Sequence, residues 1–366
     1  MVNTIHMSKE NSRVNSLRPF RPKPITHELE VLEYAAHIPV EEAVTALLEN
    51  HFVLIVDSYA SGLSVIEALK KRISRSRKEQ TFTEQRSNRN LFRKLSHQIL
   101  LEVSNHQLQV RKAPKIGWLK ELYPDTADFF LSLPEIQGLN SSWQWHEKGI
   151  EIPFLNERIH PFYGTYFPTR FEHIELFDRF LTNYTGVKQQ AIDIGIGSGV
   201  LSYLMLKHGF GEIIGTDSNP NALIGVQKHL INTNSESISL RSGDLFTNVN
   251  RQFNLIVFNP PWVPMPGKAK GIDAAMYYEK DLFPRFFEKA VNYLKPGGQI
   301  ALIFSNLAEL IDEKHIHPIA HELKTNNRFR KIDLLKMKVK PQSEKTKRTA
   351  LMREQEVVEL WVLGAK

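Results

Sequence analysis

Short apolar runs alternate with helix-like segments throughout the second half of the chain. Apolar runs of about five residues between turn signals predict buried parallel strands, whereas apolar positions three and four residues apart predict helices. The predicted strands are Gln190–Ile194, Glu212–Thr216, Ile238–Ser242, Asn254–Phe258, Gln299–Phe304, Ile332–Val339 and Val357–Leu363. Helices are expected between successive members of the first five. No helix is expected between the last two, which should therefore pair as an antiparallel hairpin. The pattern predicts an α/β fold of five parallel strand–helix units closed by that hairpin.

The first half of the chain has a mixed α+β pattern. Helical periodicity is expected over residues 28–48, 57–73 and 118–133, with breaks at Pro124 and Pro134. The strand-like runs are Phe52–Val56, Ile99–Val103 and Gln107–Val110. From Trp143 to Tyr166 the chain is aromatic and β-prone, which predicts a hairpin-rich connector.

Composition excludes several classes of chemistry. The 366 residues contain no cysteine, which excludes disulfides, thiolate metal ligation and cysteine nucleophilic catalysis, and suits a reducing cytoplasm. The sequence has no run of about eighteen apolar residues, so no membrane-spanning helix is predicted. The histidines, including His160 and His173, lack metal-site spacing, so no metal site is predicted. We therefore expect a cytoplasmic protein without a membrane segment.

The positive charge is unevenly distributed. Lys and Arg number 47 against 40 Asp and Glu, a net charge of +7. Residues 70–94 carry ten cations against Glu79 and Glu84: Lys70, Lys71, Arg72, Arg75, Arg77, Lys78, Arg86, Arg89, Arg93 and Lys94. Residues 340–353 carry Lys345, Lys347, Arg348 and Arg353. Both stretches are candidates for contact with nucleic-acid phosphates or an acidic protein, and both are equally compatible with a solvated surface.

A glycine-rich turn follows the first predicted strand. The run from Asp193 has glycine at every second position, Gly195, Gly197 and Gly199, and leads directly into an apolar helix. Glycines remove the β-carbons that would block a bulky ligand from the backbone. Such turns also serve nicotinamide and flavin dinucleotides, but an acid followed by Gly-x-Gly-x-Gly is more similar to an S-adenosylmethionine site.

Acidic residues end the next two predicted strands. Asp217 comes about twenty residues after the glycine turn, where a carboxylate can accept hydrogen bonds from both ribose hydroxyls. Asn219 and Pro220 then provide a helix N-cap and a first helical position. Asp244 follows the third strand, together with Leu245 and Phe246.

The most specific motif is Asn259-Pro260-Pro261-Trp262, directly after the fourth predicted strand. Two prolines stiffen the strand end at the sheet edge where ligands bind. A planar nitrogen attacks poorly until its N–H groups are held. The Asn259 side-chain oxygen and the Pro260 carbonyl can accept those hydrogens, while Trp262 can stack on the planar substrate.

Residues 150–366 resemble class I, Rossmann-like S-adenosylmethionine-dependent methyltransferases. Within that class they are similar to the Asn-Pro-Pro-aromatic enzymes, which include release-factor glutamine and ribosomal-RNA guanine N-methyltransferases. The resemblance implies S-adenosyl-L-methionine as cofactor, bound by Asp193, the three glycines, Asp217, Asp244, Leu245, Phe246 and Asn259. It implies that Asp244 accepts from the adenine amino group, and that the segment Tyr166–Glu172 closes over the cofactor. Trp262 departs from the Tyr or Phe usual in this family.

The resemblance also suggests a division of the chain. Residues 1–26 are expected to form a flexible basic arm, 27–142 an accessory domain for substrate recognition, 143–170 a β-rich connector and 171–366 the catalytic domain. The favoured hypothesis is methylation of a planar nitrogen in a protein or nucleic acid, with residues 264–272 as a lid. One alternative is N-methylation of a small metabolite under an N-terminal cap. Another is a catalytically silent cofactor-binding scaffold.

Overall fold

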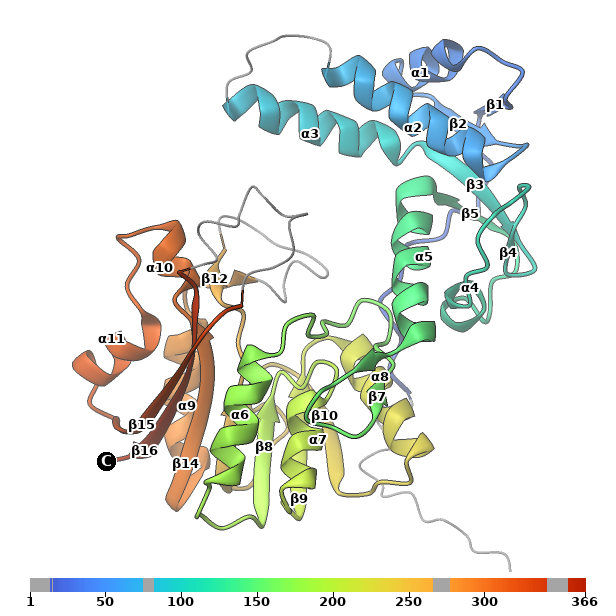
Figure 1. Cartoon of the computed structure of the whole chain (residues 1–366). Helices are drawn as coiled ribbons and strands as arrows, with labels where there is room; N and C mark the ends of the chain where they lie inside the picture. The colour runs from blue at the N-terminus through green and yellow to red at the C-terminus, as the bar shows by residue number, and fades with distance from the viewer. Residues whose placement is uncertain (1–13, 15, 75–81, 266–276, 341–354) are drawn as a thin grey trace, which may run out of the picture. The chain divides into compact units, whose positions relative to one another are not determined.

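The chain folds into two compact units, each with its own sheet (Figure 1). A computed structural model describes residues 14, 16–74, 82–265, 277–340 and 355–366. The N-terminal unit comprises Arg21–Glu147, and the C-terminal unit comprises the described residues of Lys148–Lys366 together with residues 14 and 16–20. No described helix is long and apolar enough to cross a membrane.

The N-terminal unit is a mixed α+β fold around a five-stranded sheet. Strands β1, β2 and β3 run parallel, while β4 and β5 pair antiparallel with β3. Its elements in chain order are β1 (Val31–Tyr34), α1 (Val40–Leu48), β2 (Phe52–Ile55), α2 (Tyr59–Ser74), α3 (Phe82–Ser96), β3 (Ile99–Ser104), β4 (Gln107–Leu108), α4 (Trp118–Leu122), β5 (Phe129–Ser132) and α5 (Leu133–Lys148).

Two strands of this unit lie where helix was predicted. β1 falls inside residues 28–48, and β5 falls inside residues 118–133. Each is only four residues long, too short for its apolar pattern to distinguish a strand from a helical turn. Pairing decides the outcome, because β1 lies beside β2 and β5 beside β3, both of which are buried strands.

The predicted β-rich character of residues 143–148 is wrong, because these residues complete helix α5. The start of the helix is fixed by Glu135, which accepts hydrogen bonds from both the hydroxyl (2.7 Å) and the backbone N–H (3.1 Å) of Ser132, the second of these being one half of a capping box. Pro134 therefore belongs to the first turn, where proline is tolerated, and does not break the helix. Trp143 is held by edge contact with the buried ring of Trp118, at 5.2 Å between centroids. This packing outweighs the β propensity of the tryptophans.

The C-terminal unit contains a seven-stranded sheet in the order β10-β9-β8-β11-β14-β16-β15. Its first five members are parallel, and β16 is antiparallel to both of its neighbours. The main strands are β8 (Gln190–Ile194), β9 (Glu212–Asp217), β10 (Ile238–Ser242), β11 (Phe253–Phe258), β14 (Leu294–Ser305), β15 (Phe329–Lys338) and β16 (Val357–Ala365). Two short ladders join β6 (Ile150–Glu151) to β7 (Arg158–Ile159), and β12 (Val263–Pro264) to β13 (Tyr277–Tyr278). The predicted α/β class is confirmed.

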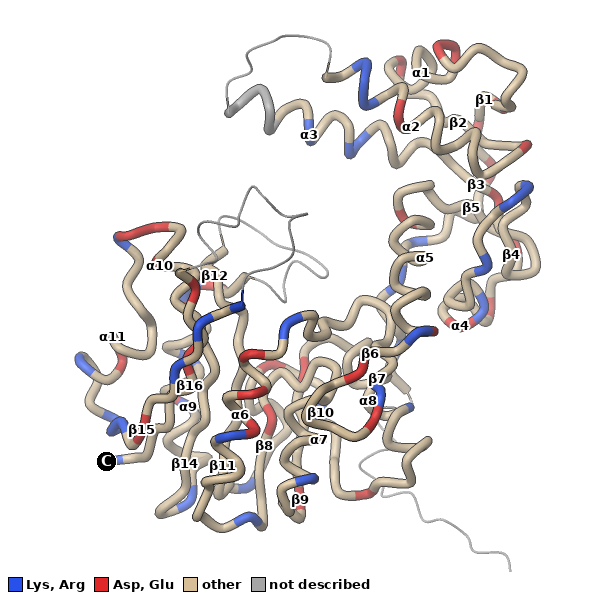
Figure 2. The backbone as a smooth tube through the Cα atoms, viewed as in Figure 1, with Lys and Arg blue, Asp and Glu red and all other residues tan. Residues whose placement is uncertain are grey.

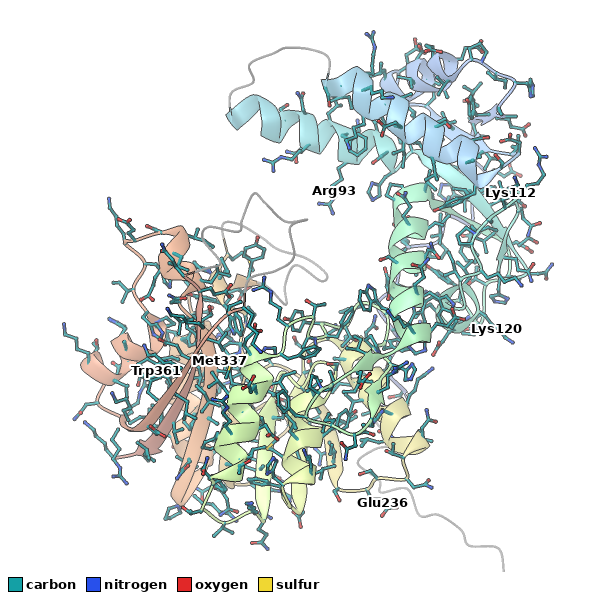
Figure 3. The ribbon with its side chains drawn as sticks, viewed as in Figure 1. Arg93, Lys112, Lys120, Glu236, Met337 and Trp361 are labelled. Carbon is teal, nitrogen blue, oxygen red and sulfur yellow. The ribbon has the colours of Figure 1, made fainter. Side chains whose placement is uncertain are left out.

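Helices cover both faces of this sheet. They are α6 (Glu172–Thr182), α7 (Val200–Lys207), α8 (Pro220–Asn232), α9 (Leu282–Tyr293), α10 (Leu307–Ile311) and α11 (Pro318–Thr325). One apolar cluster joins α6, α7 and α8 to the sheet, and a second joins α9 and α11 to it. Alternate strand residues enter different clusters: Leu255 belongs to the first and Ile256 to the second. On the terminal hairpin, Met337 packs on the first and Trp361 lies in the second (Figure 3).

One predicted helix is missing from this unit. Residues 243–252, between β10 and β11, form turns and bends, with Leu245 and Asn248 at positive φ. The connection is too short to cross the sheet as a helix. Instead Leu245, Phe246 and Val249 cover that part of the second face, where Phe246 stacks on Tyr293 at 4.5 Å.

Several predicted surface features lie wholly or partly outside the described residues. These are residues 1–13 and 15 of the arm, 75–81 of the basic stretch, 266–272 of the loop proposed as a lid, and 341–353 of the second basic stretch. Within the described part of 70–94, cations cluster in the last turns of α2 and α3 (Figure 2).

Candidate active site

Strand register brings the predicted site residues to one edge of the C-terminal sheet. Ile194 on β8 pairs with Thr216 on β9 and with Phe258 on β11. The residues that follow, Gly195, Asp217 and Asn259, therefore leave the sheet side by side. On β10, Ser242 pairs with Asp217, so the turn at residues 243–246 lies at the same edge. This edge is formed by the carboxyl ends of the parallel strands. From β8 the chain adds β9 and β10 on one side and then places β11 and β14 on the other, so the strand order reverses between β8 and β11. Open α/β sheets bind ligands at such a reversal.

The glycine turn has a backbone that only glycine adopts readily. Gly195, Gly197 and Gly199 have φ of 69°, 54° and 84°. A β-carbon on Gly195 would meet nothing within 4 Å, so the space above this residue is open to a ligand. Gly199 is the N-cap of α7, the apolar helix expected after the turn. The helix ends at Lys207, and Gly209, just after the C-cap, has a left-handed conformation with φ of 87°.

Asp217 ties the end of β9 to the glycine turn. Its carboxylate accepts hydrogen bonds from the backbone N–H of Gly197 at 2.9 Å and of Asn219 at 2.8 Å. Each oxygen keeps a second lone pair for a ligand hydroxyl. Burial raises the pKa of Asp217, and the backbone N–H donors oppose that rise. Asn219 caps α8 as predicted, because its side chain accepts from the backbone N–H of Asn221 at 3.0 Å.

Asp193 lies in the core. Its side chain is 1% exposed and accepts a hydrogen bond of 2.7 Å from the hydroxyl of Ser202 on α7. Burial raises the pKa of Asp193 to about 7, and the charge of Asp217 adds to this effect. The described contact therefore attaches β8 to α7 beneath the glycine turn. Sequence reasoning missed Ser202, and a polar position within an otherwise apolar helix was the available signal.

The residues after β10 separate into two environments. Asp244 is half exposed and forms an ion pair with Arg285 on α9, which also pairs with Asp281 at 2.8 Å. Leu245 and Phe246 are buried at 5% and 3% exposure. Phe246 contacts Tyr293 and the other rings of the second cluster, so its described partners are core side chains.

The tetrapeptide after β11 carries an unpredicted internal hydrogen bond. The indole N–H of Trp262 donates to the side-chain oxygen of Asn259 at 3.0 Å. Trp262 is partly buried and packs against both core clusters. Its ring meets that of His173 edge-on, with 5.8 Å between centroids and an interplanar angle of 86°. Burial lowers the pKa of His173 to about 4, so its imidazole is neutral at pH 7.

The segment before α6 is attached to this edge at both of its ends. Asn219 donates to the carbonyl of Gly164 at 3.0 Å, and Asn221 donates to that of Tyr163 at 2.7 Å. A β-carbon on Gly197 would lie 3.7 Å from the carbonyl oxygen of Tyr166. Further along, Arg170 pairs with Glu356 at 3.6 Å. The segment thus lies beside the glycine turn.

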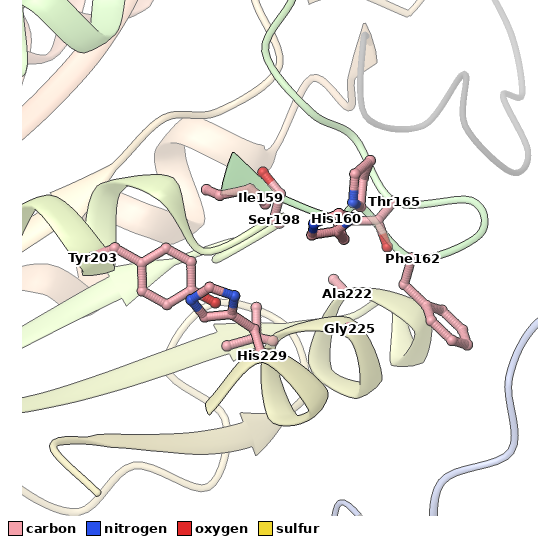
Figure 4. Close-up of a pocket in the computed structure, with 12 residues that line it drawn as sticks. Ile159, His160, Phe162, Thr165, Ser198, Tyr203, Ala222, Gly225 and His229 are labelled. Carbon is pink, nitrogen blue, oxygen red and sulfur yellow. The ribbon is translucent and has the colours of Figure 1, made fainter. Parts of the chain in front are cut away.

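A small pocket lies between this segment, the glycine turn, α7 and α8 (Figure 4). Its walls include His160, Thr165, Tyr203 and His229, with the rings of Tyr203 and His229 4.4 Å apart. The hydroxyls of Thr165 and Tyr203 are buried without a hydrogen-bond partner among the described residues. The pocket has room for about one water molecule. Of the predicted site residues, only Gly197 lines this pocket.

No group of three or more metal-ligating side chains occurs in the described ranges.

Comparison with known proteins identifies the C-terminal unit. Residues 175–330 match the methyltransferase small domain family. A protein named as an N5-glutamine methyltransferase, from Methanocaldococcus jannaschii, is 32% identical over 166 residues, covering 43% of this chain and 80% of that protein. The release factor glutamine methyltransferase of Streptococcus pneumoniae is 27% identical over 140 residues, 35% of this chain and 50% of that protein.

A third relative has a different substrate in its name. The ribosomal RNA small subunit methyltransferase C of Alcanivorax borkumensis is 27% identical over 118 residues, 32% of this chain and 33% of that protein. The chain therefore spans only half or a third of the latter two relatives, but four-fifths of the first. On the family match and that coverage, the chain belongs to the methyltransferase small domain family and is an S-adenosylmethionine-dependent methyltransferase.

Proposed function

We propose that this enzyme methylates a planar nitrogen of a macromolecule, and that the nitrogen is the side-chain amide of a protein glutamine. The observation that carries the proposal is the position of Asn259 and Pro260, which leave β11 level with the glycine turn that follows β8. The relative matched over 80% of its length bears the name of a glutamine methyltransferase, which favours a protein amide over an RNA amine.

The donor half of the proposed site comprises β8, β9 and β10. The open space above Gly195 and the carboxylate of Asp217 suit a nucleoside whose ribose hydroxyls donate to that carboxylate. Asp244 lies two interstrand steps from β8, about 10 Å, which suits recognition of the far end of the same ligand. When bound, S-adenosylmethionine supplies a methyl group on a positively charged sulfur.

The acceptor half is the end of β11. An amide nitrogen has a delocalised lone pair and is a weak nucleophile, so the enzyme must orient it. The Asn259 side-chain oxygen and the Pro260 carbonyl would accept its two N–H groups and turn the lone pair toward the donor half. In the part of the chain that the structure describes, nothing donates to the Pro260 carbonyl, so it is available for this role. Such orientation can supply roughly 7–11 kcal/mol of barrier reduction.

The N-terminal unit is proposed to be an accessory domain that selects the macromolecule. It has its own sheet and core, and it lies outside the range matched by the family model. Its described cations on α2 and α3 would add electrostatic attraction to an acidic partner.

The decisive experiment is transfer of tritium from methyl-labelled S-adenosylmethionine into an extract of cells lacking this enzyme. The expected result is label that protease releases, ribonuclease leaves in place, and acid-free digestion yields as N5-methylglutamine. Asn259→Ala is expected to lower turnover at least about a hundredfold, or about 2.7 kcal/mol, while cofactor affinity stays near that of the wild type.

Two results would contradict the proposal in different ways. Label in RNA would replace the glutamine amide with a nucleobase amine and leave the rest of the site assignment intact. Full turnover by Asn259→Ala would remove the acceptor assignment itself. Val187→Ala, at an exposed side chain near the amino end of β8, is the control for the handling of variants.

A further inference from the structure

Trp262 has a feature that stacking on a substrate does not require. Its indole N–H donates to the Asn259 side-chain oxygen at 3.0 Å. An indole N–H can only donate, so the bond identifies the carboxamide atom that faces Trp262 as oxygen. This bond uses one of the two lone pairs of that oxygen. The other lone pair remains free to accept a hydrogen bond from an N–H group of the amide that is to be methylated.

The indole is itself held in place. It packs against the apolar clusters on both faces of the sheet, and the neutral imidazole of His173 meets its ring edge-on. A side chain with these contacts has little rotational freedom. The hydrogen bond therefore transmits the rigidity of the core to the Asn259 carboxamide, whose backbone is also restricted by the two prolines that follow it.

The geometry disfavours direct stacking of the reacting group on this ring. Hydrogen-bond donors approach a carboxamide oxygen along its two lone-pair directions. Given two bonds of about 3 Å some 120° apart, with the first in the plane of the indole, a second donor nitrogen on Asn259 would lie beyond the edge of the ring and at most about 2.6 Å above its plane. Stacked planes touch at about 3.5–4.0 Å.

We infer that Trp262 is a positioning residue, which orients the Asn259 oxygen toward the acceptor amide through its indole N–H and contributes no stacking surface. This inference rests on the proposed function of Asn259. A positioning role and a stacking role for Trp262 predict different effects of Trp262→Phe. A phenyl ring preserves a stacking surface but cannot donate a hydrogen bond.

The first test needs no acceptor. In a ¹H–¹⁵N spectrum of the full chain, Trp262→Phe identifies the indole N–H signal of Trp262 among those of the five tryptophans. Asn259→Ala is expected to move that signal upfield and to speed its exchange with water, because the hydrogen bond is lost. An unchanged signal in Asn259→Ala would overturn the inference.

The second test is a double-mutant cycle on turnover, with the tritium-accepting fraction of the cell extract as acceptor. Trp262→Phe is expected to lower kcat at least about tenfold while the KM for S-adenosylmethionine stays constant. In the Asn259→Ala background the same change should have no further effect, because Trp262 acts through Asn259. Multiplying losses would mean that the ring acts on its own, and would overturn the inference.

The controls separate this inference from the proposed function. Trp262→His retains a ring nitrogen that can donate, and is expected to recover part of the turnover lost in Trp262→Phe. Val187→Ala should change neither quantity. Loss of turnover in Asn259→Ala together with full turnover in Trp262→Phe would overturn only the positioning role. Full turnover in Asn259→Ala would instead remove the acceptor assignment on which it rests.

Discussion

The carboxylate of Asp217 accepts a hydrogen bond from the backbone N–H of Gly197, 2.9 Å away and twenty residues earlier in the chain. A second bond, from the backbone N–H of Asn219, occupies its other oxygen. One side chain thus fixes the glycine turn and the start of α8 together. Each of these two turns is held by a different oxygen of the carboxylate, so both oxygens must be hydrogen-bond acceptors.

Replacement of Asp217 by Asn should therefore weaken cofactor binding and loosen the turn. An amide has one acceptor oxygen, so one of the two backbone N–H groups faces an NH₂ donor in the variant. We expect at least a tenfold loss of S-adenosylmethionine affinity by calorimetry, about 1.4 kcal/mol, with a lower thermal midpoint. Asp333→Asn, at an exposed site where the remaining amide oxygen can still accept the single backbone N–H bond, is the control. Equal affinity in both variants would remove the ribose assignment.

Asp244 and Asp281 form a matched pair, because both contact Arg285. If Asp244 binds the adenine end of the cofactor, Asp244→Ala should lower S-adenosylmethionine affinity about tenfold, whereas Asp281→Ala should leave it unchanged. Both substitutions remove one negative charge from the same arginine. Equal losses in the two variants would mean that the ion-pair network, and no contact of Asp244 with the ligand, supports binding.

Asp193 should make the C-terminal unit less stable as pH rises. Its folded pKa of about 7 lies above the unfolded value of about 3.9, so the folded state binds the proton more tightly. The resulting stability is fully present below about pH 4 and is lost by about pH 7, a change on the order of 4 kcal/mol. In Asp193→Asn this pH dependence should disappear, as measured by thermal midpoints from pH 4 to 8. A wild-type-like pH profile would show that Asp193 is ionised in the fold throughout.

His173 should have the opposite effect. Its folded pKa of about 4 lies below the unfolded value of about 6.5, so the unfolded chain binds the proton more tightly. Stability attributable to this residue is lost as pH falls from about 6.5 to 4, on the order of 3 kcal/mol. His173→Phe keeps a ring beside Trp262 and should remove this acid sensitivity. The same sensitivity in the variant would assign it to other groups.

The inner strands of the C-terminal sheet, β8, β11 and β14, were predictable because they are buried on both faces. Gln190–Ile194 and Ile238–Ser242 have the predicted bounds, and the other predicted strands overlap the observed ones. Continuous apolar runs make such strands conspicuous. The absent helix after β10 shows the limit of the rule. Alternation suggested a helix, but ten residues with three positive φ angles, at Gly243, Leu245 and Asn248, form a turn whose side chains cover the sheet.

In the N-terminal unit and in the site, the unpredicted features depend on contacts distant in sequence. Helix α5 was missed at its C-terminal end because Trp143 packs on Trp118, although the Ser-x-x-Glu spacing from Ser132, a helix-start signal, was visible in the sequence. The turn residues of the site were found from spacing alone. The bond between Trp262 and Asn259 was not, since a motif gives the order of side chains and omits their orientation.

The strand order reverses between β8 and β11, and this reversal separates the proposed cofactor-binding residues from the proposed acceptor-binding residues. Every residue proposed to hold the cofactor, apart from Asn259, belongs to β8, β9, β10 or the turns after them, whereas the residues proposed to orient the acceptor follow β11. The single ladder between β8 and β11 joins the two halves. Evolution or design can therefore change which acceptor is methylated through substitutions in the connection after β11 and in the N-terminal unit. The cofactor-binding residues on β8, β9 and β10 need not change.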